Sequence, residues 1–190
     1  MFYLGIDPGT YKTGVALWDS DTDTVGIKGH LPNEEVLDIL SRSVVPSDKV
    51  QPWVNDAVHI DEIWCETMEY QGMPVGDETF ETCIWIGEYR KTARDLGIPF
   101  RLVKRRVVRI HHCGSSRAKD SNVRGAIIGR FGYWEYGKTG LGTKKNPGTL
   151  YGVTGHAFQA LSNAVYAADT VKERERTSEL EDMEDRNDKT

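Results

Sequence analysis

The side chains best suited to chemistry in this chain are acids that follow apolar segments. Asp7 follows Phe2–Ile6 and precedes a Pro8-Gly9 turn, and Glu66 follows His59–Cys65. Proline fixes its own φ and glycine allows a backbone conformation that other residues resist, so this turn would hold the first acid rigidly at a strand end. Carboxylate oxygens fixed in this way are ligands that Mg²⁺ prefers. A structural Asx-turn in a hairpin remains the alternative for the first acid.

A third group comes from the C-terminal part of the chain. His156, Gln159 and Asn163 are spaced i, i+3 and i+7, so they share one face of a helix predicted over Gly155–Thr170. Ligands that converge from three separate elements suit metal-assisted phosphodiester cleavage, in which two ions about 4 Å apart activate a water and stabilise the leaving oxygen. A histidine that only makes a structural hydrogen bond at a helix start is the alternative for His156.

The pattern of apolar and turn residues predicts the elements that would position these groups. Strands are expected at Phe2–Asp7, Thr13–Trp18, Thr24–His30, His59–Cys65 and Ile98–Val103. Helices are expected from Asn33 as N-cap, from Asp77 to Leu96 with Gly97 as the stop, from Ser115 or Asp120 to Phe131, and over Gly155–Thr170. Three antiparallel strands followed by two parallel crossovers predict an α/β, ribonuclease H-like fold with a mixed five-stranded sheet flanked by helices. Its first and fourth strands are neighbours, which would bring the two acids to one edge.

Charge is segregated along the chain, although the formal net charge is −5. Residues 101–150 hold twelve Lys or Arg against two acids, while the remainder holds twelve against 27 acids. A local excess of this size is typical of a surface that binds a polyanion such as DNA. Aromatic residues are interleaved at Phe131, Tyr133, Trp134 and Tyr136, and the last three could stack on unpaired bases. A solvated basic face without a partner is the alternative.

The rest of the composition limits the setting in which the protein would work. Cys65, Cys83 and Cys113 are odd in number and widely spaced, which predicts free thiols in the cytoplasm. No apolar run is long enough to span a bilayer and no secretion signal is read at the N-terminus, so no membrane partner is expected. Residues 1–171 are predicted to form one domain, and the charged residues 172–190 a disordered or frayed helical tail.

Several motifs occur in a recognisable order. G-I-D-P-G-x-x-x-T-G-x-A opens the chain at Gly5–Ala16, and a strand ending in Glu66 follows. K-x-x-V-V (Lys104–Val108), Lys119 with Asn122-Val123, and H-A-x-x-A-L (His156–Leu161) come after it. Over roughly Met1–Ala168, the chain resembles the RuvC-type Holliday junction resolvases, especially their bacteriophage branch. The resemblance implies a crossover junction endodeoxyribonuclease, acting in the cytoplasm of a bacterial host if it is phage-encoded.

The chain departs from that family at two places. The family generally carries two acids, or a His and an Asp, on its last helix, whereas Gln159 stands where the second acid would fall. The missing acid could come from Asp120 or Asp169 instead. The family also places an aromatic wedge three residues after the Glu, where this chain has Glu69, with Tyr70 next to it.

These observations lead to a set of expected roles. We expect Asp7, Glu66 and His156 to hold Mg²⁺ or Mn²⁺, two ions per site, and these three with Gln159 to form the catalytic site. Branched DNA would contact Lys104, Arg105, Arg106, Lys119, Arg124, Lys144, Lys145 and Tyr70. The two-fold symmetry of a four-way junction predicts a homodimer, for which the apolar helix from Glu78 to Leu96 offers surface beyond what one core face needs.

Two other functional classes fit part of the sequence. A catalytically weak or silent junction-binding protein would keep the basic surface, and the neutral Gln159 keeps this possibility open. An ATPase of the actin-like or sugar-kinase class has a phosphate loop that also reads G-x-D-x-G-T. Those proteins duplicate the fold and need about two domains, so we expect no nucleotide cofactor.

Overall fold

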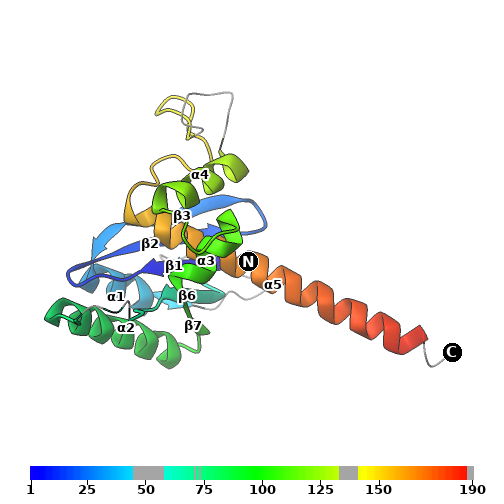
Figure 1. The fold of residues 1–190 in the computed structure, drawn as a ribbon, viewed down its shortest axis with the longest axis horizontal. Helices are drawn as coiled ribbons and strands as arrows, with labels where there is room; N and C mark the ends of the chain where they lie inside the picture. The colour runs from blue at the N-terminus through cyan, green and yellow to red at the C-terminus, as the bar shows by residue number, and fades with distance from the viewer. Residues whose placement is uncertain (45–57, 71, 73, 133–140, 188–190) are drawn as a thin grey trace.

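The structure is a computed structural model that describes residues 1–44, 58–70, 72, 74–132 and 141–187 (Figure 1). Its strands are β1 (Phe2–Asp7), β2 (Lys12–Asp19), β3 (Thr24–Pro32), β4 (Ser43–Val44), β5 (Val58–His59), β6 (Glu62–Glu66) and β7 (Phe100–Val103). Its helices are α1 (Asn33–Ser41), α2 (Asp77–Asp95), α3 (Arg105–Cys113), α4 (Asp120–Phe131) and α5 (His156–Asn187). None of the helices in the described ranges is both long and apolar enough to cross a membrane.

The main sheet has the mixed topology that the sequence predicts. Its five strands lie in the order β3-β2-β1-β6-β7, with antiparallel pairing among the first three and parallel pairing from β1 onward. The parallel neighbours β1 and β6 end on the same side, at Asp7 and Glu66 respectively. The structure therefore confirms the prediction that the two acids lie at one edge of the sheet, where neighbouring strands end.

Alternating residues of the strands build a core on each face of the sheet. Tyr3, Ala16 and Trp18 pack with buried residues of α3, α4 and α5 on one face. Leu4, Ile6, Val15 and Leu17 pack with those of α1 and α2 on the other face. Period-two alternation with both faces buried gives the three-layer arrangement in Figure 1.

The helix that carries His156 lies unusually close to the sheet. A Cβ added at Gly5 would stand 1.8 Å from the carbonyl oxygen of Ala160, and one at Gly14 would stand 2.5 Å from that of His156. Only residues without a side chain allow the backbones of β1 and β2 to approach α5 in this way. The amide of Asn163 donates to the carbonyl of Ile6 at 3.0 Å and ties the same helix to β1.

Two helices differ from the sequence prediction. α3 was not predicted, because residues 105–113 contain one buried residue, Val108, and mostly charged or half-exposed neighbours. α5 was expected over Gly155–Thr170, with a disordered or frayed helical tail beyond it. The structure has one helix that continues to Asn187, and Figure 1 shows this extension leaving the body of the protein. The exposed residues Lys172–Glu181 are rich in Glu, Arg and Lys, which favour helix without burial.

Asn33 also has a different role from the predicted N-cap. Pro32 takes the N-cap position of α1, and Asn33 is buried as the first helical residue. Its side chain donates to the carbonyls of Gly9 and Thr10, both at 3.0 Å. The asparagine therefore binds the turn that follows Asp7 rather than the end of its own helix.

Candidate active site

A cavity of about 630 Å³ opens at the edge of the sheet where β1 and β6 end. It is lined by the turn between β1 and β2, by residues 66–69, and by His30, Glu78, Arg105 and His156. The two acids expected from the sequence and the predicted histidine therefore share one cavity.

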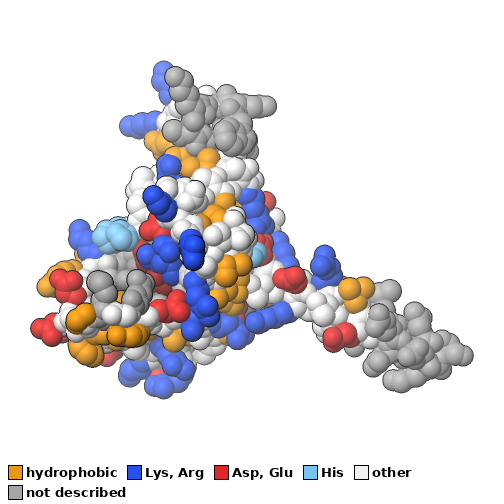
Figure 2. Space-filling model, viewed as in Figure 1, with side chains coloured by type: hydrophobic (Ala, Val, Ile, Leu, Met, Phe, Trp, Pro, Cys, Tyr) orange, Lys and Arg blue, Asp and Glu red, His pale blue; other side chains and the backbone are white. Residues whose placement is uncertain are grey.

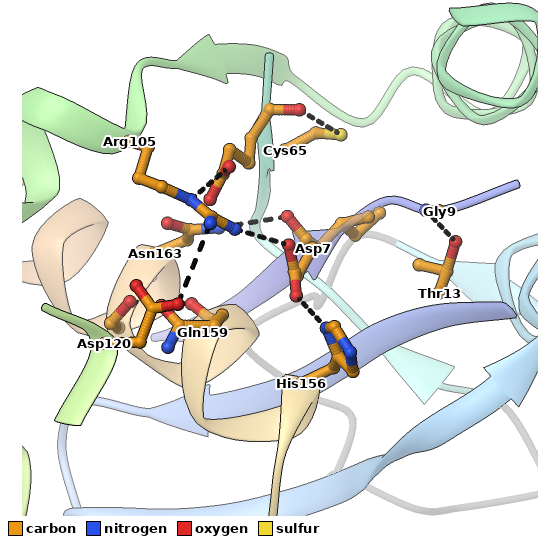
Figure 3. A network of polar contacts seen from close by, with 12 residues as sticks. Asp7, Gly9, Thr13, Cys65, Arg105, Asp120, His156, Gln159 and Asn163 are labelled. Carbon is orange, nitrogen blue, oxygen red and sulfur yellow. Dashed lines mark hydrogen bonds and ion pairs between the residues drawn. The ribbon is translucent and has the colours of Figure 1, made fainter. Parts of the chain in front are cut away.

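Asp7 is the most buried carboxylate of this cavity, with 5% of its surface exposed. Its Oδ2 accepts a hydrogen bond of 2.8 Å from Nδ1 of His156, and its Oδ1 lies 3.4 Å from Nη2 of Arg105 (Figure 3). The imidazole of His156 also stacks on His30, with ring centroids 4.4 Å apart. These contacts orient both oxygens of the aspartate.

Glu66 is buried with incomplete compensation of its charge. Burial and, to a smaller extent, the nearby charge of Asp7 raise its pKa to about 7, although Arg105 acts in the opposite direction. The arginine donates from Nε to Oε1 of Glu66 at 2.7 Å. Because one guanidinium does not restore the usual pKa, this edge of the sheet retains a demand for positive charge.

A polar network holds the turn that supports Asp7. Thr13 donates from Oγ1 to Oδ1 of Asn33 at 2.9 Å and lies 3.1 Å from the phenol oxygen of Tyr89 in α2. The backbone N–H of Gly9 donates to the same threonine at 3.4 Å. Sequence reasoning missed Asn33 and Tyr89, since neither lies in a motif. The turn is thus fixed from both α1 and α2.

The remaining polar residues of α5 have mixed surroundings. Figure 3 shows Gln159 on the helix between His156 and Asn163, near Asp120. Asp120 reaches this region from the start of α4 and lies 3.8 Å from Nη1 of Arg105. Asp169, the other acid considered for the missing ligand, pairs with His111 and Arg130 instead. Asp120 is therefore the better placed of the two.

The expected DNA contacts divide into exposed and paired residues. Lys119, Arg124, Lys144 and Lys145 are exposed, and Tyr70 is 77% exposed. Lys104 and Arg106 are also exposed and lie 3.6 and 3.9 Å from Glu69. Arg105 instead lies among the carboxylates of the cavity. Figure 2 shows Lys and Arg side chains gathered over the middle of the viewed face.

Some expectations concern residues outside the described part of the chain. Tyr133, Trp134 and Tyr136, which were expected to stack on bases, lie there. The basic loop after them is described from Leu141 and contains an isolated bridge between Gly142 and Pro147. Within the described residues, no group of three or more His, Cys, Asp or Glu side chains is arranged to hold a metal ion.

The sheet order and the position of α5 define an α/β fold of the ribonuclease H-like class. A scan against models of protein families gives no match, and a search of curated proteins gives none either.

Solved structures give the particular version of this fold, which is that of RuvC. RuvC from Thermus thermophilus is similar with a TM-score of 0.57 and 16% sequence identity, covering 86% of this chain and 91% of the other. RuvC from T. thermophilus in complex with a Holliday junction substrate is similar with a TM-score of 0.58 and 17% identity, covering 90% and 96%. At such identities the similarity establishes the fold.

Proposed function

We propose that this protein is a metal-dependent endonuclease that cuts four-way or other branched DNA by phosphodiester hydrolysis. The observation that carries the proposal is the pair Asp7 and Glu66, brought by parallel strands into one cavity of a RuvC fold. One RuvC structure of the same fold contains a Holliday junction. The relation to the bacteriophage branch rests on the sequence motifs, and action in the cytoplasm on the free cysteines.

The residues at this edge fit a divalent cation as cofactor. Asp7 and Glu66 supply the carboxylate oxygens that Mg²⁺ and Mn²⁺ bind. Burial raises the pKa of Glu66 to about 7, so Arg105 alone does not offset the cost of the charged carboxylate there. Bound ions would supply an activated water and stabilise the leaving oxygen. His156 holds Asp7 through Nδ1, and its half-exposed ring can hold or move a proton at Nε2.

DNA would lie across exposed basic residues of the segment that follows β7. We propose that Lys104, Arg106, Lys119, Arg124, Lys144 and Lys145 contact phosphates, which positions the DNA without reading its sequence. Tyr70, four residues beyond Glu66 and largely exposed, is the proposed aromatic wedge at the centre of the junction. Stacking of one base on such a ring contributes about 1–3 kcal/mol.

A homodimer would place two such cavities on one junction. The proposed interface is the outer face of α2, where Phe80 and Ile84 are 59% and 57% exposed and lie one turn apart. Ile86 and Tyr89 of the same helix are buried against the sheet. The helix thus has an apolar inner face and a second apolar strip outside, which a partner chain would cover.

A silent junction-binding protein is the second candidate. It is favoured by the neutral side chain of Gln159 and by the guanidinium that already contacts Asp7 and Glu66. Such a protein would bind branched DNA through the same basic residues and would not cut it.

The test is cleavage of a labelled four-way junction and of a linear duplex with Mg²⁺, Mn²⁺ or a chelator. We expect metal-dependent cutting of the junction alone. Asp7→Asn should abolish cutting while junction binding is retained, because the aspartate is buried inside the cavity and is not among the residues proposed to contact phosphates. Cutting by this variant at the wild-type rate would refute the assignment. Binding without cutting by the wild type would favour the silent protein.

A further inference from the structure

Arg105 makes an unusual set of contacts for a residue of a basic, DNA-facing segment. Its Nε donates to Glu66 at 2.7 Å, its Nη2 lies 3.4 Å from Asp7, and its Nη1 lies 3.8 Å from Asp120 (Figure 3). One planar cation thus contacts carboxylates from β1, β6 and α4. Its neighbour Arg106 lies 3.9 Å from Glu69, outside this group.

The backbone fixes the guanidinium at this place. β7 pairs with β6 in a register that sets Val103 beside Glu66, and Thr67 donates to the carbonyl of Val103 at 2.9 Å. α3 begins directly after β7, with Lys104 at its N-cap. Arg105 is the first residue of that helix, so its position beside Glu66 follows from sheet pairing and not from a flexible loop.

The charges at the site leave limited room for further cations. Asp7, Glu66 and Asp120 carry three formal negative charges, and Arg105 with Arg109, which donates to Asp120 at 2.8 Å, carries two positive ones. One divalent ion and one phosphodiester would make this group neutral. A second divalent ion would leave an excess of two positive charges around Asp7 and Glu66, whose side chains are only 5% and 14% exposed, which is unfavourable.

We propose that Arg105 takes the place of a second metal ion. Each chain then binds one divalent ion on Asp7 and Glu66, and the guanidinium supplies the second positive charge beside the phosphate. This inference rests on the proposed nuclease function. The neutral Gln159 is consistent with it, since a site with one ion needs fewer acids.

The chemistry of arginine suits only part of what an ion does. Its planar fork of N–H donors matches both carboxylate and phosphate oxygens, so it can move between Glu66 and a phosphate without losing pairing. It stays protonated and cannot activate a water. Arg105 would therefore stabilise charge on the phosphate oxygens.

The experiment measures Mn²⁺ binding to the full chain by titration calorimetry, without DNA, for the wild type, Arg105→Gln and Arg106→Gln. We expect one ion per chain for the wild type and for Arg106→Gln, the matched control on the same helix. Arg105→Gln should bind its ion at least about tenfold tighter, because a positive charge beside the carboxylates is removed. Two ions on the wild type, or identical binding by Arg105→Gln, would overturn the proposal.

Electron paramagnetic resonance on the Mn²⁺-saturated wild type needs no variant. Two ions held about 3.5–4 Å apart, as in two-metal sites, would give a spin-coupled spectrum, which contradicts the proposal, whereas we expect uncoupled ions. No Mn²⁺ binding by any form would refute both this proposal and the metal-dependent function. The expected stoichiometries without junction cutting would refute the nuclease function alone.

Discussion

The two clusters of buried charge in this protein differ in how completely they are paired. At the sheet edge, Glu66 is buried beside Asp7 and its pKa rises to about 7. Where α3, α4 and α5 meet, burial would raise the pKa of Asp169, but hydrogen bonds from Arg130 and His111 outweigh burial and hold this pKa well below its usual range. The first cluster keeps a demand for a cation, and the second is satisfied by the chain itself.

The second cluster acts as a clamp between helices. Asp169 in α5 pairs with His111 of α3 and Arg130 of α4, and His112 donates from Nε2 to the carbonyl of Ser162 at 2.9 Å. Three helices are thus joined with their polar groups paired. An acid that serves packing is expected to be saturated with partners, and an acid that serves a ligand is not.

The largest expected effect is on the junction cleavage rate, which should depend on the cluster at the sheet edge and not on the clamp. Glu66→Gln should lower the junction cleavage rate by about three orders of magnitude, because metal-assisted stabilisation is worth several kcal/mol. Asp169→Asn should leave the rate within a few-fold of wild type, since the clamp does not line the cavity. Single-turnover cleavage at saturating Mn²⁺ measures both. Equal losses in the two variants would contradict the division of roles.

The next effect concerns stability against pH in the metal-free protein. Burial lowers the pKa of His112 to about 4 from 6.5. As the pH falls, this histidine is therefore protonated in the unfolded chain before it is protonated in the folded protein, and the free energy of unfolding falls as the pH drops from 6.5 towards 4. The raised pKa of Glu66 acts oppositely: stability is gained as pH drops from 7 towards 4.5. Each shift corresponds to about 3 kcal/mol.

Because these two contributions oppose each other, we expect a nearly flat wild-type profile from pH 7 to 4.5. Denaturant unfolding of His112→Gln, which keeps a donor for Ser162, should show stability rising on acidification. In Glu66→Gln, the free energy of unfolding should instead fall on acidification. Parallel profiles for the two variants would mean that the clusters do not differ in the stated way.

A smaller effect is expected when the clamp is broken. Asp169→Asn should lower the free energy of unfolding by about 1–2 kcal/mol, a value reduced by the partial exposure of Arg130. Asp95→Asn is the matched control, because it removes an exposed pair with Lys91 in α2 and should leave the melting temperature unchanged. Similar shifts in the two variants would show that the clamp has no special weight.

The smallest effect concerns the choice of metal ion. Mn²⁺ accepts imidazole and neutral ligands more readily than Mg²⁺, so we expect severalfold faster cleavage with Mn²⁺. Gln159→Asp should lower the ratio of the Mn²⁺ rate to the Mg²⁺ rate, because it adds a carboxylate near the site. Gln159→Asn, whose side chain is as long as that of aspartate but neutral, should leave this ratio unchanged. A ratio unchanged by the aspartate would place residue 159 outside the metal's surroundings.

Much of the fold could be predicted because its signals are local. Alternating apolar residues gave β1, β2 and β3 to within two residues, and Gly97, with φ of +74°, ends the helix region where expected. The neighbouring ends of β1 and β6 followed from topology. α3 escaped prediction because it buries only Val108 and its basic residues were assigned to the DNA surface.

The candidate site was harder to predict because its contacts are distant in sequence. Arg105 was assigned to the DNA surface with its basic neighbours, since composition does not tell an inward arginine from an outward one. Its contact with Asp7 spans 98 positions in the sequence. Asn33 binds the turn near Asp7 from 24 residues away, which no local pattern reveals.

The close approach of α5 to the sheet has a consequence for how such a protein diverges. Because Gly5 and Gly14 let backbone rest directly on backbone, the distance between Asp7 and His156 does not depend on the volume of intervening side chains. Apolar residues elsewhere in the core can then be exchanged over long periods without moving the chemistry. Replacement of either glycine, even by alanine, would push the histidine away from the aspartate. The two glycines are therefore as necessary to this geometry as the two acids.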